Sequence, residues 1–403
     1  MAKKTLSSLD VSGKTVLVRA DFNVPTDDAN RITDDRRIKA ALPTIRHILA
    51  KGGAVVAVSH FGRPAGTGHE PDQSLRPVYE RLKELLGTDA TVLFAGKVPT
   101  DPESQAAIKA LKPGQVLLLE NLRFEKGEKK GDAAFAKLLA EAAHAYVNDA
   151  FGASHRNDAS MVALPHAMKP RPCVAGFLLE KELAFLGQAI EHPKRPFVAI
   201  VGGAKVSDKL GALSNLMDKV DTIIVGGAMA YTFLRAQGLG TGSSLVEAAM
   251  VEKAASILAD AAARKKTVLL PQDHLCGREL KEGTQTMTCE GAIPDGWMGL
   301  DIGPKAQAAY AHAIVTAKQV VWNGPMGAFE TKPFDAGTRA VAHAVVKATA
   351  AGAVTIAGGG DTAAALEADG LADRLTHVST GGGASLEMLE GKKFDSVAAL
   401  DPA

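Results

Sequence analysis

The hydrophobic pattern of the chain alternates short β-branched runs with longer segments in which apolar residues recur at helical spacing. In the first half, the predicted strands are Thr15–Asn23, Ala54–His60, Thr91–Phe94, Gln115–Phe124 and Ala145–Ala150. The predicted helices between them include Asp34–Ala50, Ser74–Leu86 and Asp132–Ala142. Because the strand runs are nearly continuous in Val, Ile and Leu, we expect both faces of their sheet to be covered.

The second half repeats this scheme. Its predicted strands are Phe197–Gly203, Thr222–Gly227, Thr267–Pro271, Gln319–Pro325, Ala353–Gly360 and His377–Gly383. Segment Cys276–Pro294 is rich in Gly and Thr without helical periodicity, which indicates short antiparallel strands or an excursion loop. Alternation of strands and helices in both halves predicts an α/β protein with two doubly wound parallel-sheet lobes, each Rossmann-like.

Prolines mark the expected boundary between the lobes, near Pro170–Pro196. They flank a helical stretch at roughly Leu178–Ile190. A helix between prolines suits a stiff connector and hinge, although an ordinary interdomain helix would have the same pattern. We therefore predict an N-terminal lobe over residues 1–172, a connecting hinge helix over 173–192 and a C-terminal lobe that starts at residue 193.

Composition excludes several classes of protein. The 403 residues are 46% hydrophobic and carry 46 Lys and Arg against 45 Asp and Glu, which argues against binding to nucleic acid by bulk charge. The three cysteines are widely spaced, so neither a disulfide framework nor a CxxC metal site is expected. The N-terminus lacks the apolar core of a signal peptide, and no run is long enough to span a membrane. These features predict a cytoplasmic protein without a membrane partner.

Polar side chains end the strands of the first half. Ligands of open α/β sheets bind beyond the carboxyl ends of the strands, so these residues predict a site for a small anion. They are Asp21, Asn23, His60, Arg63, Arg123, His155 and Arg156. Arg37, at a helix start, suits the same site, but a salt bridge to Asp34 is the ordinary alternative. For His60 and His155, a structural role and an anion-binding role both remain open.

Glycines end the strands of the second half. An extended phosphate chain can approach bare backbone closely, with amides pointing at it. The glycine-bearing ends are Gly202–Gly203, Gly226–Gly227, Gly324, Gly358–Gly360 and Gly381–Gly383. One such pair is typical of a turn, whereas five in one lobe favour a nucleotide site. Neither a Walker A sequence nor a dinucleotide GxGxxG fingerprint is present.

Two charged positions refine this nucleotide prediction. Lys205 and Lys209 are four residues apart, so they are either two solvated lysines or two amines that converge on a polyphosphate. Asp361 follows a glycine turn, where it suits a helix cap. Beside phosphates, its carboxylate would need a divalent cation, and Mg²⁺ is held by one or two carboxylates plus substrate phosphates. Asp361 is therefore our candidate metal ligand.

Nine motifs together carry a family resemblance. They are Arg19–Pro25, Ser59–Pro64, Leu119–Phe124, Asn148–Gly152, Gly202–Lys209, Gly226–Phe233, Trp322–Pro325, Gly358–Thr362 and Ser379–Ser385. In this order the chain resembles the phosphoglycerate kinase family over essentially its whole length. The resemblance implies a phosphotransferase that moves the acyl phosphate of 1,3-bisphosphoglycerate to ADP, reversibly giving 3-phosphoglycerate and ATP in glycolysis.

The resemblance also implies roles for individual residues. The phosphoglycerate site would comprise Asp21, Asn23, Arg37, His60, Arg63, Arg123 and Arg156. The nucleotide site, with Mg²⁺ on Asp361, would comprise Gly203, Ala204, Lys205, Lys209, Gly227, Asn323, Pro325, Glu330, Gly359, Gly360, Asp361 and Thr362. Arg37 and Lys205, with the amides near Gly382 and Gly383, are the expected catalytic groups, and Glu330 would accept hydrogen bonds from the ribose.

Further implications concern the whole chain. The lobe over residues 193–389 would bind nucleotide, the segment over residues 390–403 would pack back on the N-terminal lobe, and the lobes would close around their substrates in a monomer. Two departures, Phe61 where Leu is usual and Arg36 beside Arg37, leave local substrate packing open, and the short tail ending at Ala403 leaves the crossover open. Two alternatives are a non-catalytic bilobed protein that binds a phosphorylated ligand and a dinucleotide-dependent oxidoreductase, which the missing glycine fingerprint disfavours.

Overall fold

The computed structural model describes residues 3–141 and 143–403. Ala142, the last residue of the predicted helix Asp132–Ala142, and Met1 and Ala2 lie outside the described residues. The chain divides into two compact units, Met1–Leu183 with Lys393–Ala403 and Ala184–Lys392. Each unit contains one six-stranded parallel sheet, which confirms the predicted fold class. Within the described part, no helix is long and apolar enough to cross a membrane.

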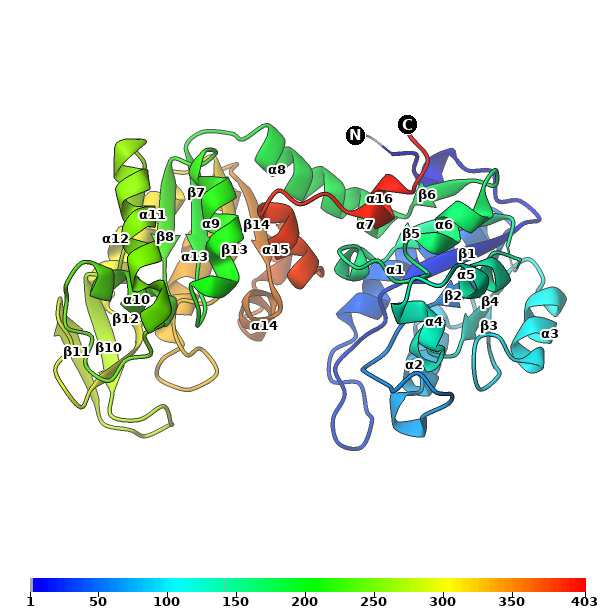
Figure 1. Cartoon of the computed structure of the whole chain (residues 1–403), viewed down its shortest axis with the longest axis horizontal. Helices are drawn as coiled ribbons and strands as arrows, with labels where there is room; N and C mark the ends of the chain where they lie inside the picture. Colours follow the sequence, from blue (N-terminus) through cyan, green and yellow to red (C-terminus); the bar gives the residue numbers. More distant parts are fainter. Residues whose placement is uncertain (1–2, 142) are drawn as a thin grey trace. The chain divides into compact units, whose positions relative to one another are not determined.

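The sheet of the first unit has the strand order β3-β4-β2-β1-β5-β6. Its strands are β1 (Thr15–Ala20), β2 (Ala54–Val58), β3 (Thr91–Ala95), β4 (Gln115–Leu119), β5 (Ala145–Asp149) and β6 (Cys173–Ala175). Its helices are α1 (Arg36–Ala50), α2 (Arg76–Leu86), α3 (Pro102–Ala110), α4 (Lys126–Lys129), α5 (Ala133–Ala140), α6 (Ala163–Met168), α7 (Phe177–Glu182) and α16 (Asp395–Ala398). Figure 1 shows these elements, with α16 near β6.

Apolar residues of α1 and α2 bury one face of this sheet. Ile38, Ile45 and Ile48 of α1 join Val78 and Leu82 of α2 in one buried cluster with the strands. Helix α6 contacts β5 and also packs against α5, whose Phe135 and Leu139 are buried. Burial on both faces explains why the strands are apolar without alternation, as the sequence predicted.

The C-terminal segment belongs to the first unit. The amide of Asp401 donates to the carbonyl of Cys173 in β6 at 2.8 Å, and the Ser396 hydroxyl donates to the carbonyl of Ser154 at 2.6 Å. Lys3 and Pro402 form an antiparallel bridge. Residues from both ends of the chain thus extend the same edge of the sheet.

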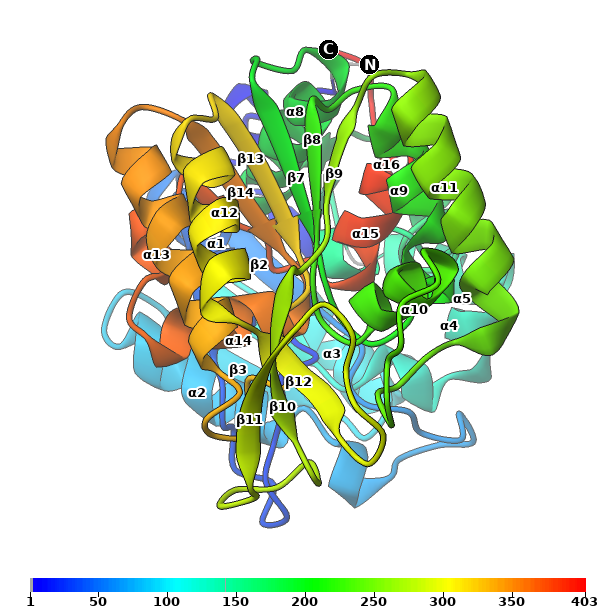
Figure 2. The ribbon, with the colours of Figure 1, turned by 90° about the vertical axis from the view of Figure 1, so that its left-hand side faces the viewer.

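The sheet of the second unit has the order β15-β14-β13-β7-β8-β9. Its strands are β7 (Phe197–Val201), β8 (Thr222–Val225), β9 (Thr267–Leu269), β13 (Gln319–Asn323), β14 (Val354–Gly358) and β15 (His377–Val378). Its helices are α8 (Gln188–Glu191), α9 (Leu210–Met217), α10 (Met229–Ala236), α11 (Val251–Ala263), α12 (Pro304–Val315), α13 (Ala336–Ala350), α14 (Gly360–Ala368) and α15 (Gly383–Leu389). In Figure 2, α12 and α13 lie on one face of the sheet, and α9 and α11 lie on the other.

A second, three-stranded antiparallel sheet extends from this unit. It consists of β10 (Asp273–Gly277), β11 (Thr286–Glu290) and β12 (Met298–Ile302) in the order β11-β10-β12. Strand β11 lies within segment Cys276–Pro294, and β10 overlaps the start of that segment. For this segment the sequence was consistent with either antiparallel strands or a loop. The structure therefore favours the strands. Figure 2 shows this small sheet below the parallel one.

The connecting segment is helical from Phe177 to Glu191, close to the predicted Leu178–Ile190. It comprises α7, a π-helical turn over Leu183–Gly187, and α8. The division between the two units falls inside this turn, after Leu183.

Candidate functional site

Arg37 lies in the first turn of α1, in the first unit. Its Nη1 atom donates to a carboxylate oxygen of Asp21 at 3.0 Å and to the carbonyl of Asn23 at 3.0 Å. The salt bridge to Asp34, which was the ordinary alternative for Arg37, is instead made by Arg36, at 2.5 Å. The structure thus separates the two neighbouring arginines, and only Arg37 reaches the residues that follow β1.

His60 follows β2 and is buried, with 1% of its surface exposed. Its Nδ1 atom lies 3.1 Å from Nη2 of Arg19, and its Nε2 atom lies 3.0 Å from Nη1 of Arg156. Burial, followed by the charges of Arg19, Arg123, Arg156 and Arg37, holds the pKa of His60 well below its usual range. The ring is therefore neutral at neutral pH, surrounded by four guanidinium groups.

The turn after His60 joins the remaining members of this group. The amide of Gly62 donates to the side-chain oxygen of Asn23 at 2.8 Å, and Nη1 of Arg123 donates to the carbonyl of Gly62 at 2.7 Å. Burial lowers the pKa of Arg123, and its Nε atom has no hydrogen-bond partner among the residues described. Arg63 is exposed on the same loop.

We call Arg19, Arg37, His60, Arg123 and Arg156, together with Asp21 and Asn23, the arginine cluster. Five of its members were predicted from the strand ends and Arg37 from a helix start. Direct contacts join Arg37 to Asp21 and Asn23, and His60 to Arg19 and Arg156, while Arg123 joins the group through the Gly62 carbonyl. Arg19 was not predicted. It is fully buried although it lies inside the apolar run of β1, and a charge in such a run needs a buried partner. An arginine within this apolar run was therefore the feature of the sequence from which Arg19 could have been predicted.

Phe61 is buried, with 6% of its surface exposed, and belongs to the hydrophobic core of the first unit. Its amide and carbonyl both bond to the Asn121 side chain, at 3.0 and 2.8 Å. The aromatic ring at this position therefore packs among core residues.

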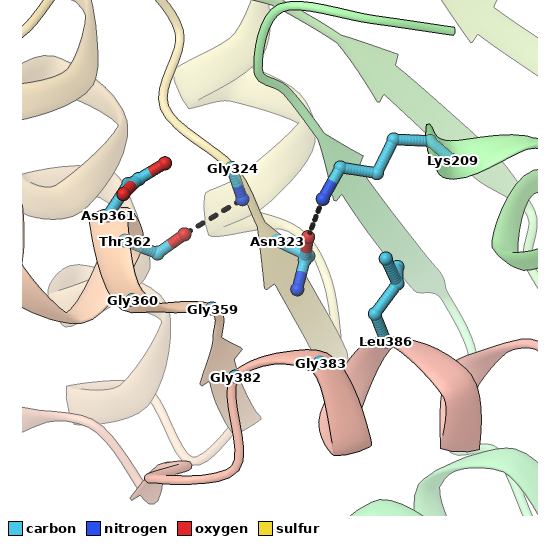
Figure 3. A pocket seen from close by; sticks show the side chains of 10 residues that line it. All are labelled: Lys209, Asn323, Gly324, Gly359, Gly360, Asp361, Thr362, Gly382, Gly383 and Leu386. Carbon is cyan, nitrogen blue, oxygen red and sulfur yellow. Dashed lines mark hydrogen bonds between the residues drawn. The ribbon is translucent and has the colours of Figure 1, made fainter. Parts of the chain in front are cut away.

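The second unit contains a cavity of about 210 Å³ at the carboxyl ends of its central strands. Figure 3 shows its lining. Of the predicted nucleotide residues and catalytic glycines, the cavity brings together Lys209, Asn323, Gly359, Gly360, Asp361, Thr362, Gly382 and Gly383. Gly324 and Leu386 also line it. The site prediction named neither residue, although the sequence did mark Gly324 as a glycine at a strand end.

Hydrogen bonds fix the floor of this cavity. The Lys209 amine donates to the side-chain oxygen of Asn323, whose amide nitrogen donates to the carbonyl of Gly358 at 3.1 Å. The Thr362 hydroxyl accepts the amide proton of Gly324 at 2.8 Å. These bonds join the ends of β13 and β14 to α14 (Figure 3). Burial lowers the pKa of Lys209, against the opposing charges of Asp208, Asp361 and Glu390.

Asp361 lies in the first turn of α14, and its side chain is exposed to the cavity. No hydrogen bond or ion pair ties its carboxylate to any residue in the described ranges. It therefore does not cap its own helix, and Gly359 occupies the N-cap position. An exposed carboxylate without a protein partner, beside a lysine and backbone amides, is a donor that suits a hydrated Mg²⁺ carried on phosphates.

The glycines of the second unit fall into two groups. A Cβ atom on Gly324, which has φ of +99°, would overlap the carbonyl oxygen of Gly202, and one on Gly227 would lie 2.5 Å from the amide nitrogen of Gly203. These glycines allow the backbones after β7, β8 and β13 to touch. A Cβ on Gly360 or Gly382 would meet nothing within 4 Å. Of these four glycines, Gly360 and Gly382 therefore border open space where a ligand can lie.

Six predicted nucleotide residues lie outside the cavity lining: Gly203, Ala204, Lys205, Gly227, Pro325 and Glu330. The amide of Gly203 donates to the carbonyl of Pro325 at 3.1 Å, so these two residues serve backbone packing. Ala204, Lys205 and Glu330 are exposed. Lys205 precedes the short 3-10 turn Ser207–Lys209, so it shares no continuous helix with Lys209.

Comparisons with known proteins agree with one another. Residues 6–392 match the family description "Phosphoglycerate kinase". Curated relatives with that name include those of Chloroflexus aggregans (51% identity over 404 residues) and Chlorobium limicola (51% over 402), each covering 100% of both chains. The phosphoglycerate kinase structure from Coxiella burnetii has a TM-score of 0.87 and 40% identity, and it covers 98% of both chains. The one from Pyrococcus horikoshii has a TM-score of 0.85 and 30% identity, with the same coverage. The chain belongs to the phosphoglycerate kinase family.

Proposed function

We propose that the arginine cluster binds phosphoglycerate and that the glycine-lined cavity of the second unit binds the nucleotide. As a member of its family, the chain is a phosphotransferase that moves the acyl phosphate of 1,3-bisphosphoglycerate to ADP, reversibly, in glycolysis. The observation that carries the proposal is a cluster of guanidinium groups around the buried His60 in one unit and an open, glycine-lined cavity in the other.

The charge balance of the arginine cluster supports an anionic ligand. The guanidinium groups of Arg19, Arg37, Arg123 and Arg156 outnumber the carboxylates that contact them. Buried cations need anionic partners because desolvation disfavours their charge. Arginine matches the planar geometry of carboxylate and phosphate oxygens, both of which 3-phosphoglycerate carries. Exposed Arg63 completes this proposed substrate site.

In the proposed nucleotide site, the Lys209 amine and the amides near Gly359, Gly360, Gly382 and Gly383 face the phosphates. Thr362 and Asn323 hold this floor in shape, and Glu330 is proposed to accept hydrogen bonds from the ribose. Gly203, Ala204, Gly227 and Pro325 shape the adjoining backbone. We propose that Asp361 contributes a carboxylate to Mg²⁺ carried with the nucleotide, where the cation offsets phosphate charge.

The proposed mechanism needs no general base. An acyl phosphate leaves as a stable carboxylate, and ADP attacks through a phosphate oxygen that is already ionised. Catalysis then consists of in-line positioning and neutralisation of the transferring group. Arg37 from the first unit and Lys205 from the second, with the amides of Gly382 and Gly383, are the proposed neutralising groups.

Because the two ligands belong to different units, we propose that the units approach each other when both substrates are bound. Residues 173–192 would serve as the hinge, and residues 390–403 would tie the chain back to the first unit. Small-angle scattering that detects no compaction with both ligands present would contradict this closure. We further propose a cytoplasmic monomer, because one chain supplies both sets of residues and all three cysteines are buried and free.

A coupled assay for ATP formation from ADP and 1,3-bisphosphoglycerate tests the proposal. We expect turnover that is lost when the substrate is omitted and that is weakened in Asp361→Asn at limiting Mg²⁺. A non-catalytic protein for a phosphorylated ligand would bind without turnover, an alternative that kinase-named relatives do not favour. Turnover that depended on a nicotinamide cofactor would instead support the oxidoreductase alternative.

A further inference from the structure

Arg19 is a fully buried charged group of the first unit, and each of its nitrogens has a partner. Its Nε atom donates to the Ser160 hydroxyl at 2.9 Å, and Nη1 donates to the carbonyl of Ala20. The Ser160 hydroxyl and amide in turn donate to the two carboxylate oxygens of Glu128, at 2.5 and 2.9 Å. Glu128 is also fully buried. This network leaves the Arg19 guanidinium a single orientation, with Nη2 aimed at His60.

That orientation restricts the proton on the His60 ring. A guanidinium only donates, so the Nδ1 atom 3.1 Å away must accept. A neutral imidazole has one acceptor nitrogen, and its proton then resides on Nε2. The opposite tautomer would point an N–H at Arg19, and the Asp21 oxygen is 3.9 Å from Nδ1, too distant to accept it.

The consequence appears on the other side of the ring. Nε2–H and Nη1 of Arg156 are then two donors that face each other across 3.0 Å. Two facing donors are satisfied by an acceptor placed against both, and an anionic oxygen is the strongest such acceptor. Arg156 is half-buried, so it can adjust to admit that oxygen, whereas Arg19 is locked in place.

We propose that Arg19 is a positioning residue that holds His60 with its proton on Nε2, so that His60 and Arg156 together seat one oxygen of an anionic substrate. This inference rests on the proposed function, because it takes that anion to be phosphoglycerate. Arg19 itself contacts no ligand in this scheme. Its effect passes through the tautomer of His60, which can be measured without any substrate.

The first test is nuclear magnetic resonance of the full chain labelled with ¹⁵N-histidine, without ligand at neutral pH. The His60 signals are identified by their loss in His60→Gln. We expect an unprotonated, pyridine-type Nδ1 and a protonated Nε2. A proton on Nδ1, or on both nitrogens, overturns the inference. This readout is independent of activity, so the two proposals fail separately. Normal turnover with the proton on Nδ1 would contradict only the role of Arg19, whereas absence of turnover would contradict the proposed function.

The second test removes Arg19. Because Arg19→Met alone would leave Glu128 as an unpaired buried charge, the variant is Arg19→Met with Glu128→Gln. We expect mixed His60 tautomers, a KM for 3-phosphoglycerate raised about tenfold, the effect of losing one hydrogen bond to a charged group, and kcat changed less than KM. The control is Tyr146→Phe, which removes a buried bond to the Ser160 carbonyl at 2.9 Å without touching Arg19. A folded double variant with unchanged KM and tautomer contradicts the inference. If it fails to fold, the wild-type spectrum still decides.

Discussion

Nη1 of Arg37 lies 3.0 Å from a carboxylate oxygen of Asp21, and the next residue back in the chain, Arg36, pairs with Asp34 instead. Asp21 is almost fully buried and holds the Arg37 guanidinium in place before any substrate arrives. Two adjacent arginines therefore have separate partners. This separation provides an internal control for the catalytic role proposed for Arg37.

We predict that Arg37→Ala lowers kcat by about 10²–10³, the usual cost of losing one preorganised electrostatic partner of the transition state. Arg36→Ala removes the same charge one residue away and is expected to change kcat less than about threefold, because its partner Asp34 is a half-buried surface group. Steady-state kinetics of both variants check this. Near wild-type turnover in Arg37→Ala, or equal losses in both, would remove Arg37 from the mechanism.

A similar comparison separates the two lysines of the second unit. Lys209 is partly buried on the cavity floor against Asn323, so Lys209→Ala is expected chiefly to raise the KM for ADP. Lys205 is exposed and outside the cavity lining, so Lys205→Ala is expected to lower kcat more than it weakens ADP binding. Kinetics and calorimetric titration with ADP measure both quantities. If Lys205→Ala weakened ADP binding more than it lowered kcat, Lys205 would be a binding residue only.

Two glycine substitutions test which glycines serve the ligand. Gly360→Ala adds a methyl group into open cavity space, so we expect the unfolding free energy to change by less than about 1 kcal/mol while the KM for ADP rises about tenfold. Gly324→Ala adds it against the Gly202 backbone at a φ of +99°, so we expect a loss of about 2 kcal/mol or more. Urea unfolding and kinetics are the measurements. Unchanged ADP binding in Gly360→Ala would show that phosphates do not approach there.

Asp149 predicts a pH dependence of stability. Its carboxylate is fully buried at the end of β5, where it accepts the amides of Leu178 and Leu179 at 2.9 and 3.3 Å. Burial raises its pKa from 3.8 to about 6. Between these values the folded chain binds more protons than the unfolded chain, so stability falls as pH rises through this window.

Asp149→Asn removes the buried charge and keeps an oxygen acceptor. We expect its stability relative to wild type to improve by about 1–3 kcal/mol between pH 4 and pH 7.5, measured by urea unfolding and circular dichroism. Asp101→Asn is the control, because the pKa of Asp101 is shifted in the opposite direction and its substitution should lose stability as pH rises. Partial burial opposes the shift, but bonds from the amides of Ser104, Lys97 and Val98 lower the Asp101 pKa. If the difference in unfolding free energy between Asp149→Asn and wild type did not vary with pH, the prediction would be contradicted.

Much of the fold follows from local pattern. The long Val, Ile and Leu runs became strands because both faces of each sheet are covered. The predicted strands extend too far at their C-terminal ends, where polar residues no longer take part in the hydrogen bonds of the sheet. Gln115–Phe124, for example, ends as a strand at Leu119, because the Glu120 carboxylate turns to accept the amide of Leu75 at 3.1 Å. The strands β6 and β12 were missed. The first has only three residues and follows prolines, and the second contains Gly299 and Asp301, so neither has the continuous apolar pattern of a buried strand.

The candidate site was predictable in kind more than in detail. The polar strand ends named residues that the structure gathers in the arginine cluster, because parallel strands bring their carboxyl ends to one edge. Their role in binding an anion stays a prediction. The pairing of Arg19 with Ser160 and Glu128 joins residues more than a hundred positions apart, so no local pattern reveals it. Glycine spacing also could not distinguish Gly324, which admits a neighbouring backbone, from Gly360, which borders open space.

The central claim is that each unit holds one substrate, and hydrogen–deuterium exchange with mass spectrometry tests it most directly. With 3-phosphoglycerate alone, we predict slower exchange in peptides that contain Asp21–Arg37 and Phe61–Arg63. With ADP and Mg²⁺ alone, we predict slower exchange in peptides that contain Gly359–Thr362 and Gly382–Leu386. Protection of the first unit by ADP, or of the glycine-lined cavity by 3-phosphoglycerate, would contradict the account.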